Sequence, residues 1–267
     1  MVQRESGYAE ILGARIYYER IGKGPVLVFL HGFSFDTTVW DDQIDAFAQK
    51  YRILRYDLRG FGRSTSSEVS YTHAGDLKAL LEYLHIREAY LAGLSLGGGA
   101  IINFALMFPG IARALILVAP SLGGFPWSTN VASAQASMQS KMLDRGIDVA
   151  REIWIRQTIF RHAMNNKTLA ARLKDMVGRY SGWHWVHADL GKPMVPPAID
   201  RLGEIRVPTL VMVGDEDAPD QLRIADILER DIAGSRKIVF TGVGHLVNME
   251  DPLQFNNRVL EFLDNTG

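Results

Sequence analysis

The sequence predicts an α/β protein built on a mostly parallel, doubly wound sheet. Short apolar runs alternate with stretches of helical periodicity, and continuous runs of this kind are typical of strands buried on both faces. The four clearest runs are Val26–Leu30, Ile53–Tyr56, Ala114–Val118 and Leu210–Val213. A further strand-like segment, Glu88–Gly93, leads through a sharp glycine-rich turn into a helix-like segment, Ala100–Phe108. This alternation of strand and helix predicts the fold class.

The remaining elements follow the same logic in chain order. Tyr8–Leu12 and Arg15–Arg20 are joined at Gly13-Ala14 and predict a β-hairpin. Apolar residues recur near the helical period in Thr38–Gln49 and Ala74–Leu84, which predicts a helix after each of the next two strands.

The alternation stops after Pro120 and resumes near Val207. Residues 121–200 contain no convincing buried strand but several helix-like stretches, including Val149–Phe160 and Leu169–Val177. Gly123-Gly124 and Pro193–Pro197 punctuate the two ends. We therefore expect one core domain formed by residues 1–120 and 201–267, with residues 121–200 inserted as a helical cap.

Composition restricts the class of partner. The chain has 267 residues, of which 47% are hydrophobic, and a formal net charge of −1 without a long Lys or Arg run. A large core and a small-molecule substrate are expected, and nucleic acid or membrane is not. There is no cysteine and no apolar signal core, which suits the cytoplasm. The oligomeric state is left open.

The turn between the fifth predicted strand and its helix has the form Gly-x-Ser-x-Gly, from Gly93 to Gly97. Its two glycines let strand and helix approach so closely that Ser95 is pushed into a strained, exposed conformation suited to a nucleophile. Glycine-rich turns also bind phosphate, but the dinucleotide and P-loop patterns are both missing here. We interpret Ser95 as a nucleophile.

A serine nucleophile needs a base, and the base needs a carboxylate that orients it. Four acids lie together after the strand at Thr209–Val213, and a histidine follows the strand-like Lys237–Phe240. The acids are Asp215, Glu216, Asp217 and Asp220, and the histidine is His245. An aspartate at a strand end can also be a helix cap, which is the alternative for any of these acids.

Five motifs together resemble the capped α/β-hydrolase family along the whole chain. They are His31-Gly32-Phe33-Ser34, the segment from Asp57 to Ser64, the elbow from Gly93 to Gly97, Gly214-x-x-Asp217 and Gly244-His245. The resemblance implies that Ser95 is the nucleophile, His245 the base and Asp217 the orienting acid, with Asp215 as runner-up. It also implies an oxyanion hole formed by the backbone N–H groups of Phe33 and Leu96.

Other polar residues have simpler interpretations. We expect His31 to hold its loop, and Asp57, Arg59 and Arg63 to form a buried set of hydrogen bonds and ion pairs. His184, His187 and Asp189 could suggest a metal site, but their spacing does not place them on one helical face. No metal and no cofactor are therefore expected.

The serine excludes relatives that use an aspartate at the elbow, the haloalkane dehalogenases and soluble epoxide hydrolases. The stretch from Gly244 to Pro252, with Phe255 and Asn256, is similar to the enol-lactonase and carboxylesterase branch. A small ester or lactone is the implied substrate. Carbon–carbon bond hydrolases of ring-cleavage products, cofactor-free perhydrolases and small-ligand receptors share this skeleton and remain alternatives.

The expected cap holds four of the five tryptophans and five of the nine methionines. Such residues often only hold a helical layer together. A cap must nevertheless bury one face above Ser95, so we expect an apolar substrate pocket lined by Trp127, Met138, Met142, Trp154, Trp183 and Trp185.

Overall fold

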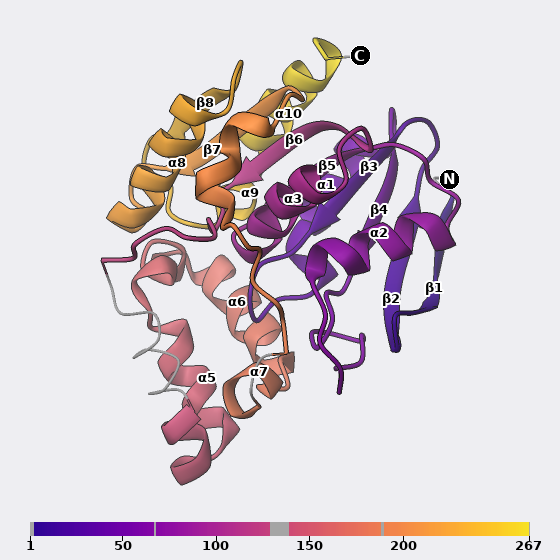
Figure 1. The fold of residues 1–267 in the computed structure, drawn as a ribbon. Helices are drawn as coiled ribbons and strands as arrows, with labels where there is room; N and C mark the ends of the chain where they lie inside the picture. Colours follow the sequence, from indigo (N-terminus) through magenta and orange to yellow (C-terminus); the bar gives the residue numbers. More distant parts are fainter. Residues whose placement is uncertain (1–2, 67, 129–138, 188–189, 267) are drawn as a thin grey trace.

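The computed structural model describes residues 3–66, 68–128, 139–187 and 190–266, and its centre is an eight-stranded sheet (Figure 1). The strand order is β1-β2-β4-β3-β5-β6-β7-β8, in which β1, β2 and β4 pair antiparallel and the other pairs are parallel. The strands are β1 Arg4–Ile11, β2 Ala14–Ile21, β3 Val26–Leu30, β4 Arg52–Tyr56, β5 Ala89–Leu94, β6 Ala112–Val118, β7 Thr209–Gly214 and β8 Arg236–Phe240.

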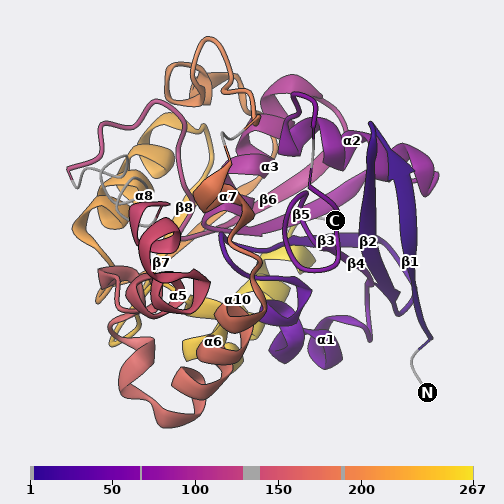
Figure 2. The same cartoon turned by 90° about the horizontal axis from the view of Figure 1, so that it is seen from below.

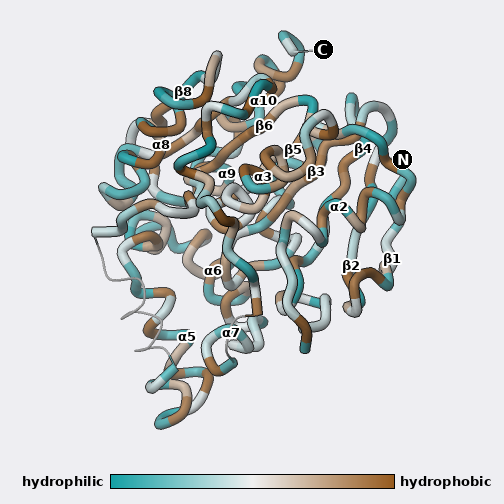
Figure 3. Tube along the Cα trace, viewed as in Figure 1, coloured by the Kyte–Doolittle hydropathy of each residue, from teal (hydrophilic) through white to brown (hydrophobic). Residues whose placement is uncertain are grey.

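Helices cover both faces of the sheet. On one face, α2 (His73–Tyr83), α3 (Leu96–Met107) and α8 (Pro219–Asp231) pack on a common apolar core. On the other face, α1 (Asp41–Phe47), α9 (Val247–Glu250) and α10 (Pro252–Asp264) pack on a second core. Figure 3 shows the hydrophobic colouring concentrated along the strands between these layers. The predicted doubly wound α/β fold is confirmed.

Local sequence signals set where these helices begin. Thr72 accepts a hydrogen bond from the Gly75 N–H at the start of α2, and Asp251 accepts one from Gln254 at the start of α10. Pro219 and Pro252 occupy first-turn positions of α8 and α10, where a missing N–H costs nothing. No helix in the described part of the chain is long and apolar enough to cross a membrane.

The connection between β6 and β7 is helical. It contains α5 (Ile147–Ile155), α6 (Lys167–Arg179) and α7 (Trp183–Val186), together with the 3-10 turns η2 (Thr158–Phe160), η3 (Ala163–Asn165) and η4 (Ala198–Glu204). Its described residues form no named strand, only an isolated bridge between Gly191 and Tyr71. Figures 1 and 2 show α5, α6 and α7 gathered to one side of the sheet. The helix expected at 169–177 is present within α6, whereas the one expected at 149–160 ends at Ile155 and is followed by the separate turn η2.

Polar contacts of three side chains join this connection to the loop that follows β3, which also contains the 3-10 turn η1 (Thr37–Trp40), and to the start of α1. Each contact links a long side chain of α5 or α6 with a short polar residue of that loop or the start of α1. The pairs are Trp154 with Ser34 at 2.7 Å, Arg172 with Asp42 at 2.8 Å and Arg179 with Asp36 at 3.1 Å. The helical connection is therefore seated on the segment that precedes and begins α1.

The turn between β5 and α3 depends on glycine because backbone atoms crowd both positions. A Cβ atom on Gly97 would lie 2.7 Å from the carbonyl oxygen of His31, and closer still to that of Leu30. A Cβ on Gly93 would lie 2.6 Å from the backbone nitrogen of Gly98. These neighbours are backbone atoms in a packed core and cannot rotate away.

We therefore expect Gly97→Ala to destabilise the protein by about 2 kcal/mol or more, because β3 and α3 must separate to admit the methyl group. Urea unfolding monitored by circular dichroism would measure the loss. Gly178→Ala in α6 is the matched control, since a Cβ there meets nothing within 4 Å. The control should be neutral or more stable by up to about 1 kcal/mol. Equal stability of the two variants would contradict this account of the elbow.

Candidate active site

Ser95 lies in the turn between the end of β5 and the start of α3, with φ 52° and ψ −111°. A non-glycine residue at positive φ costs of order 1–3 kcal/mol, and such strain collects at functional sites. The turn is fixed by a hydrogen bond from the Ser95 N–H to Val118 at 2.9 Å, and the residue is only partly buried. The strained, accessible serine predicted from the motif is present.

Asp217 and His245 form a buried pair. Asp217 follows β7 and His245 lies between β8 and α9, and Oδ2 of the aspartate is 2.8 Å from Nδ1 of the histidine. An ionised carboxylate only accepts hydrogen bonds, so Nδ1 carries the proton and Nε2 is left as the acceptor. Asp215 is exposed and accepts from the Gly242 N–H at 2.7 Å instead. The structure thus pairs the histidine with Asp217.

Charge around His245 raises its pKa above the usual value of 6.5. Burial of the ring lowers the pKa, but the charge of Asp217 and its hydrogen bond act in the opposite direction, and the charge of Glu250 adds to them. The net effect favours the protonated ring. A raised pKa makes the neutral ring a stronger proton acceptor, which suits the expected role of a general base.

The three residues follow the carboxyl ends of parallel strands in one part of the sheet. β5, β6, β7 and β8 are consecutive neighbours in the sheet, so Ser95, Asp217 and His245 follow strands that end at the same edge. The hydrogen bond within the set joins Asp217 and His245. Among the described residues, none joins Ser95 Oγ to His245, and such contacts often tighten only when substrate binds.

The two expected oxyanion donors belong to segments that meet beside Ser95. Leu96 is the first residue of α3, where backbone N–H groups have no partner within the helix. Phe33 follows Gly32, and a Cβ on Gly32 would lie 3.5 Å from the Cβ of Ser95. The loop after β3 therefore approaches Ser95 directly.

Buried polar groups hold this loop in place. Nε2 of His31 accepts the Leu58 N–H at 2.8 Å, so the other ring nitrogen, 2.8 Å from the Gly32 carbonyl oxygen, is the donor. Burial lowers the pKa of His31 despite the nearby charge of Asp57, which keeps the ring neutral. His31 thus ties the loops after β3 and β4 together, as predicted.

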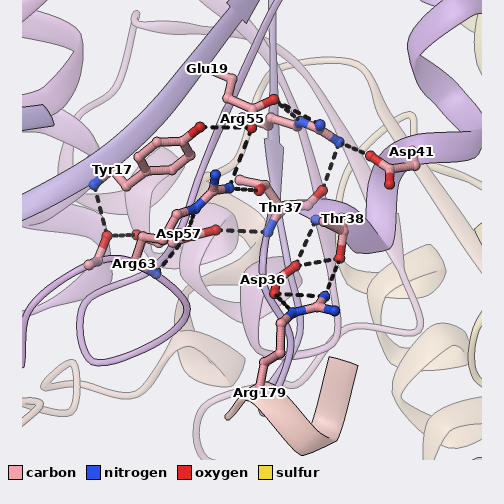
Figure 4. Close-up of polar contacts among 11 residues, drawn as sticks. Tyr17, Glu19, Asp36, Thr37, Thr38, Asp41, Arg55, Asp57, Arg63 and Arg179 are labelled. Atoms are coloured by element: carbon pink, nitrogen blue, oxygen red, sulfur yellow. Dashed lines mark hydrogen bonds and ion pairs between the residues drawn. The ribbon is translucent and has the colours of Figure 1, made fainter. Parts of the chain in front are cut away.

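Asp57 and its neighbours extend this support (Figure 4). The Asp57 carboxylate accepts the N–H groups of Thr37 and Arg63, each at 2.8 Å. Beside it, Arg55 is almost fully buried and is held by acids of β2 and α1 while it donates to the Thr37 carbonyl oxygen at 3.0 Å. Arg59 forms a separate buried ion pair with Asp76. The predicted set is confirmed in part: Arg63 contacts Asp57 but its side chain is 44% exposed, and Arg59 pairs with Asp76 instead of joining Asp57.

Aromatic side chains of the β6–β7 connection surround the ring of Phe33. The ring centroids of Trp154, Tyr180 and Trp185 lie 5.3, 5.6 and 6.4 Å from it, and Phe61 of the core lies at 5.4 Å. Phe33 itself remains partly exposed. We call Phe33, Phe61, Trp154, Tyr180 and Trp185 the aromatic cluster.

The other expected pocket residues lie elsewhere. The sulfur of Met142 packs beside Gly182, and the ring of Trp183 stacks on His187 at 4.9 Å. Trp127 is 37% exposed and packs edge-on against Phe125 at 5.3 Å. Met138 lies outside the described residues. Among the described members of the predicted set, Trp154 and Trp185 are the two whose rings lie against Phe33 in the loop after β3.

The histidines considered as metal ligands have separate partners. Nδ1 of His184 lies 2.9 Å from the Tyr180 hydroxyl, and its ring stacks on Phe61 at 4.2 Å. Nδ1 of His187 lies 3.0 Å from the Trp183 carbonyl oxygen. Asp189 lies outside the described residues, and within those residues no group of three His or acidic side chains is arranged to hold a metal.

Three contacts near the site escaped sequence reasoning. Ser34 accepts the Trp154 indole N–H, Tyr180 joins the aromatic cluster, and Glu250 binds the loop that carries His245. Glu250 is only five residues after His245, so the sequence alone could have suggested that this acid binds the loop around the histidine. Nothing in the sequence pairs Trp154 with Ser34.

A cavity of about 500 Å³ runs along α3, beneath residues 191–195. It reaches Leu96 and Ser121, and the Ser121 N–H donates to the Ser95 carbonyl oxygen at 2.9 Å. Asn103 and Met107 line it further along the helix. The volume suits a small molecule, so the helix that follows Ser95 has a ligand-sized recess along it.

Fold and site together define a hydrolase of the α/β class. The chain belongs to the Alpha/beta hydrolase family, whose profile matches residues 27–258. The structure is similar to an enol-lactonase from Burkholderia xenovorans LB400, with 25% identity, a TM-score of 0.77 and coverage of 97% of this chain and 100% of that one. It is also similar to a thermophilic esterase from Thermogutta terrifontis, with 27% identity, a TM-score of 0.81 and 99% coverage of both.

Among characterised sequences, a 2-hydroxy-6-oxononadienedioate/2-hydroxy-6-oxononatrienedioate hydrolase from Burkholderia vietnamiensis is 29% identical over 265 residues. The match covers 93% of this chain and 91% of the relative. The family predicted from the motifs is confirmed, and the lactonase and esterase neighbours match the predicted branch.

We expect the pKa of His245 to lie above 6.5 and to fall below that value in Asp217→Asn, because burial then acts without its main opposing charge. NMR titration of the ¹³C-labelled histidine rings would measure it, with His245→Gln assigning the signal. Asp215→Asn should leave this pKa unchanged. A pKa that responds to Asp215 and not to Asp217 would contradict the pairing.

Proposed function

We propose that the protein is a serine hydrolase that cleaves a small carboxylic ester or lactone through an acyl-enzyme on Ser95. The observation that carries the proposal is the strained Ser95 at the same sheet edge as the buried Asp217–His245 pair. Lactonase and esterase neighbours of similar length support it.

The reaction follows from the positions of these groups. Nε2 of His245 takes the Ser95 hydroxyl proton as Oγ attacks the carbonyl carbon, and Asp217 stabilises the imidazolium that forms. The backbone N–H groups of Phe33 and Leu96 bind the developing oxyanion. His245 then returns the proton to the leaving oxygen. Water, activated by the same histidine, attacks the acyl-enzyme and releases the acid and Ser95. A lactone gives a single hydroxy acid.

A carbon–carbon bond hydrolase is the second candidate, favoured by the 29% identical relative that carries this activity. In that case the leaving group is a carbon atom, and His245 must protonate it. Perhydrolase activity would replace water with peroxide at the acyl-enzyme. A receptor would keep the triad and turn over slowly. All four candidate functions, the three enzymes and the receptor, involve a small molecule as the partner.

We further propose that residues 121–200 act as a lid that selects the acyl group. The aromatic cluster supports this role, because it places Trp154 and Trp185 of that segment against the partly exposed ring of Phe33. A small apolar or aromatic acyl group in contact with Ser95 would lie beside these rings.

Ser95→Ala and His245→Ala should each lower kcat at least ~10³-fold, and the double variant should lose scarcely more, because the two side chains act as one unit. The assay is hydrolysis of short 4-nitrophenyl esters beside a panel of small lactones. Below the His245 pKa the rate should fall as the base becomes protonated. Asp217→Asn should be nearly as damaging as the alanine variants, and Asp215→Asn is the matched control.

Each outcome separates the candidates. Additive losses would overturn the catalytic unit. One slow turnover with a raised melting temperature would identify a receptor. Cleavage confined to vinylogous diketones, with esters and lactones untouched, would identify the carbon–carbon bond hydrolase. Peroxide-dependent activity on simple acids would identify the perhydrolase.

In an ester series of increasing acyl length, each added methylene should contribute up to ~0.8 kcal/mol of binding free energy, so kcat/KM should rise with length. It should then fall once the acyl group is too long for the pocket. Trp154→Ala and Trp185→Ala should move the optimum to longer chains. Trp127→Ala, whose ring packs on Phe125, is the control with no shift. If Asn103→Phe moved the optimum instead, the acyl group would occupy the cavity along α3, and the lid role would be wrong.

A further inference from the structure

The loop that carries His245 is held by one buried carboxylate. Glu250 belongs to α9, and its side chain is 3% exposed. Its Oε2 accepts the N–H of Gly244 at 2.8 Å, and its Oε1 accepts the N–H of Leu246 at 3.0 Å. These residues precede and follow His245, so Glu250 fixes the backbone on both sides of the histidine.

A third contact brings the β6–β7 connection to the same carboxylate. Nδ1 of His162 forms a hydrogen bond with Oε2 of Glu250. Because a carboxylate only accepts, Nδ1 is the donor. The backbone at Gly244 also lies close to His162, since a Cβ on Gly244 would be 2.8 Å from the Cβ of His162. His162 is 36% exposed and directly precedes η3, and its contact involves none of the residues that join α5 and α6 to the loop after β3.

We propose that His162 is a positioning residue that acts on His245 through Glu250, so that the seating of residues 121–200 sets the orientation of the base. This inference deepens the proposed function and rests on it. No hydrogen bond in the described part of the chain joins His162 to Ser95. The effect of His162 passes through one carboxylate that also binds both backbone N–H groups beside His245.

The arrangement also has an electrostatic consequence. Two acids face His245, Asp217 from the loop after β7 and Glu250 from α9, and the charge of Glu250 contributes to the raised pKa of His245. A donor on Glu250 draws its charge away from His245. Loss of the His162 donor should therefore raise the His245 pKa further, whereas loss of the Glu250 charge should lower it.

The experiment measures the His245 pKa by NMR of the ¹³C-labelled rings, together with the pH profile of kcat/KM, in four variants. His162→Leu should raise the pKa and move the acidic limb of the profile to higher pH, with a loss of about 10-fold in kcat/KM on the plateau. Glu250→Gln should lower the His245 pKa and move the acidic limb of the profile to lower pH, each by about 0.5 pH unit or more. His162→Asn places an amide N–H near the lost Nδ1 and should restore the wild-type values.

Arg172→Leu is the matched control. It removes another contact between residues 121–200 and the core, the ion pair with Asp42, without touching Glu250. Its melting temperature should fall about as much as that of His162→Leu, while the His245 pKa stays at the wild-type value. If Glu250→Gln does not fold, the contrast between His162→Leu and His162→Asn decides the question alone.

The inference is overturned if His162→Leu leaves the His245 pKa and the pH profile unchanged, or if it shifts the pKa in the same direction as Glu250→Gln. It is also overturned if Arg172→Leu reproduces the full effect, because His162 would then be only one of several tethers. A wild-type protein that cleaves no ester or lactone would refute the proposed function, and the order of the His245 pKa values would still test the inference.

Discussion

The close approach of backbone to backbone where α3 leaves β5 is the constraint on which the site depends. Gly97 lies so near the carbonyl groups of Leu30 and His31 that a methyl group has no room, and this contact fixes α3 against the end of β3. Ser95 is thereby held at positive φ, with its N–H bonded to Val118 of the neighbouring strand. Strain of order 1–3 kcal/mol is supported by the packing of a whole sheet. The same contact places the loop after β3 beside the serine, so the proposed nucleophile and one expected oxyanion donor are both positioned by the packing of α3 on β3.

Polar groups, rather than apolar packing alone, then fix the shape of the loop after β3. Ser34 also has a positive φ, and the residues after it are held by the carboxylates of Asp36 and Asp57. Burial raises the pKa of Asp36, but hydrogen bonds from Thr38 and the charge of Arg179 outweigh it and keep this acid ionised. Breaking one partner of such a buried set leaves a charge uncompensated, which costs several kcal/mol. The loop therefore has one favourable arrangement, and Arg179 of α6 is part of it (Figure 4).

Sequence reasoning was sufficient where a local pattern determines the structure, and insufficient where distant segments meet. The apolar runs predict the positions of the parallel strands. The spacing within the Gly214-x-x-Asp217 motif favours Asp217 over Asp215, and in the structure Asp217 is the acid that is hydrogen-bonded to His245. Periodicity showed that α5 and α6 have apolar faces, but it does not say which residue each face meets. For that reason Trp127 and Trp154 looked equivalent in the sequence, whereas one packs on Phe125 and the other on Phe33. The hydrogen bond between His162 and Glu250 joins two residues that no sequence motif includes together, so no local pattern could have predicted it.

Phe33 makes substrate selection and catalysis interdependent in the proposed mechanism. Its backbone N–H is an expected oxyanion donor, and its ring lies against Trp154 and Trp185. A shift of the Phe33 backbone would move both the ring and the donor, and a misplacement of about 1 Å at a reacting centre can cost ~10²-fold in rate. An acyl group that packs well against the aromatic cluster would hold the donor in place as the oxyanion forms. Binding energy of this kind is realised in the transition state, so discrimination between acyl groups should appear in kcat as well as in KM. The lid would then select substrates by completing the site instead of merely admitting them.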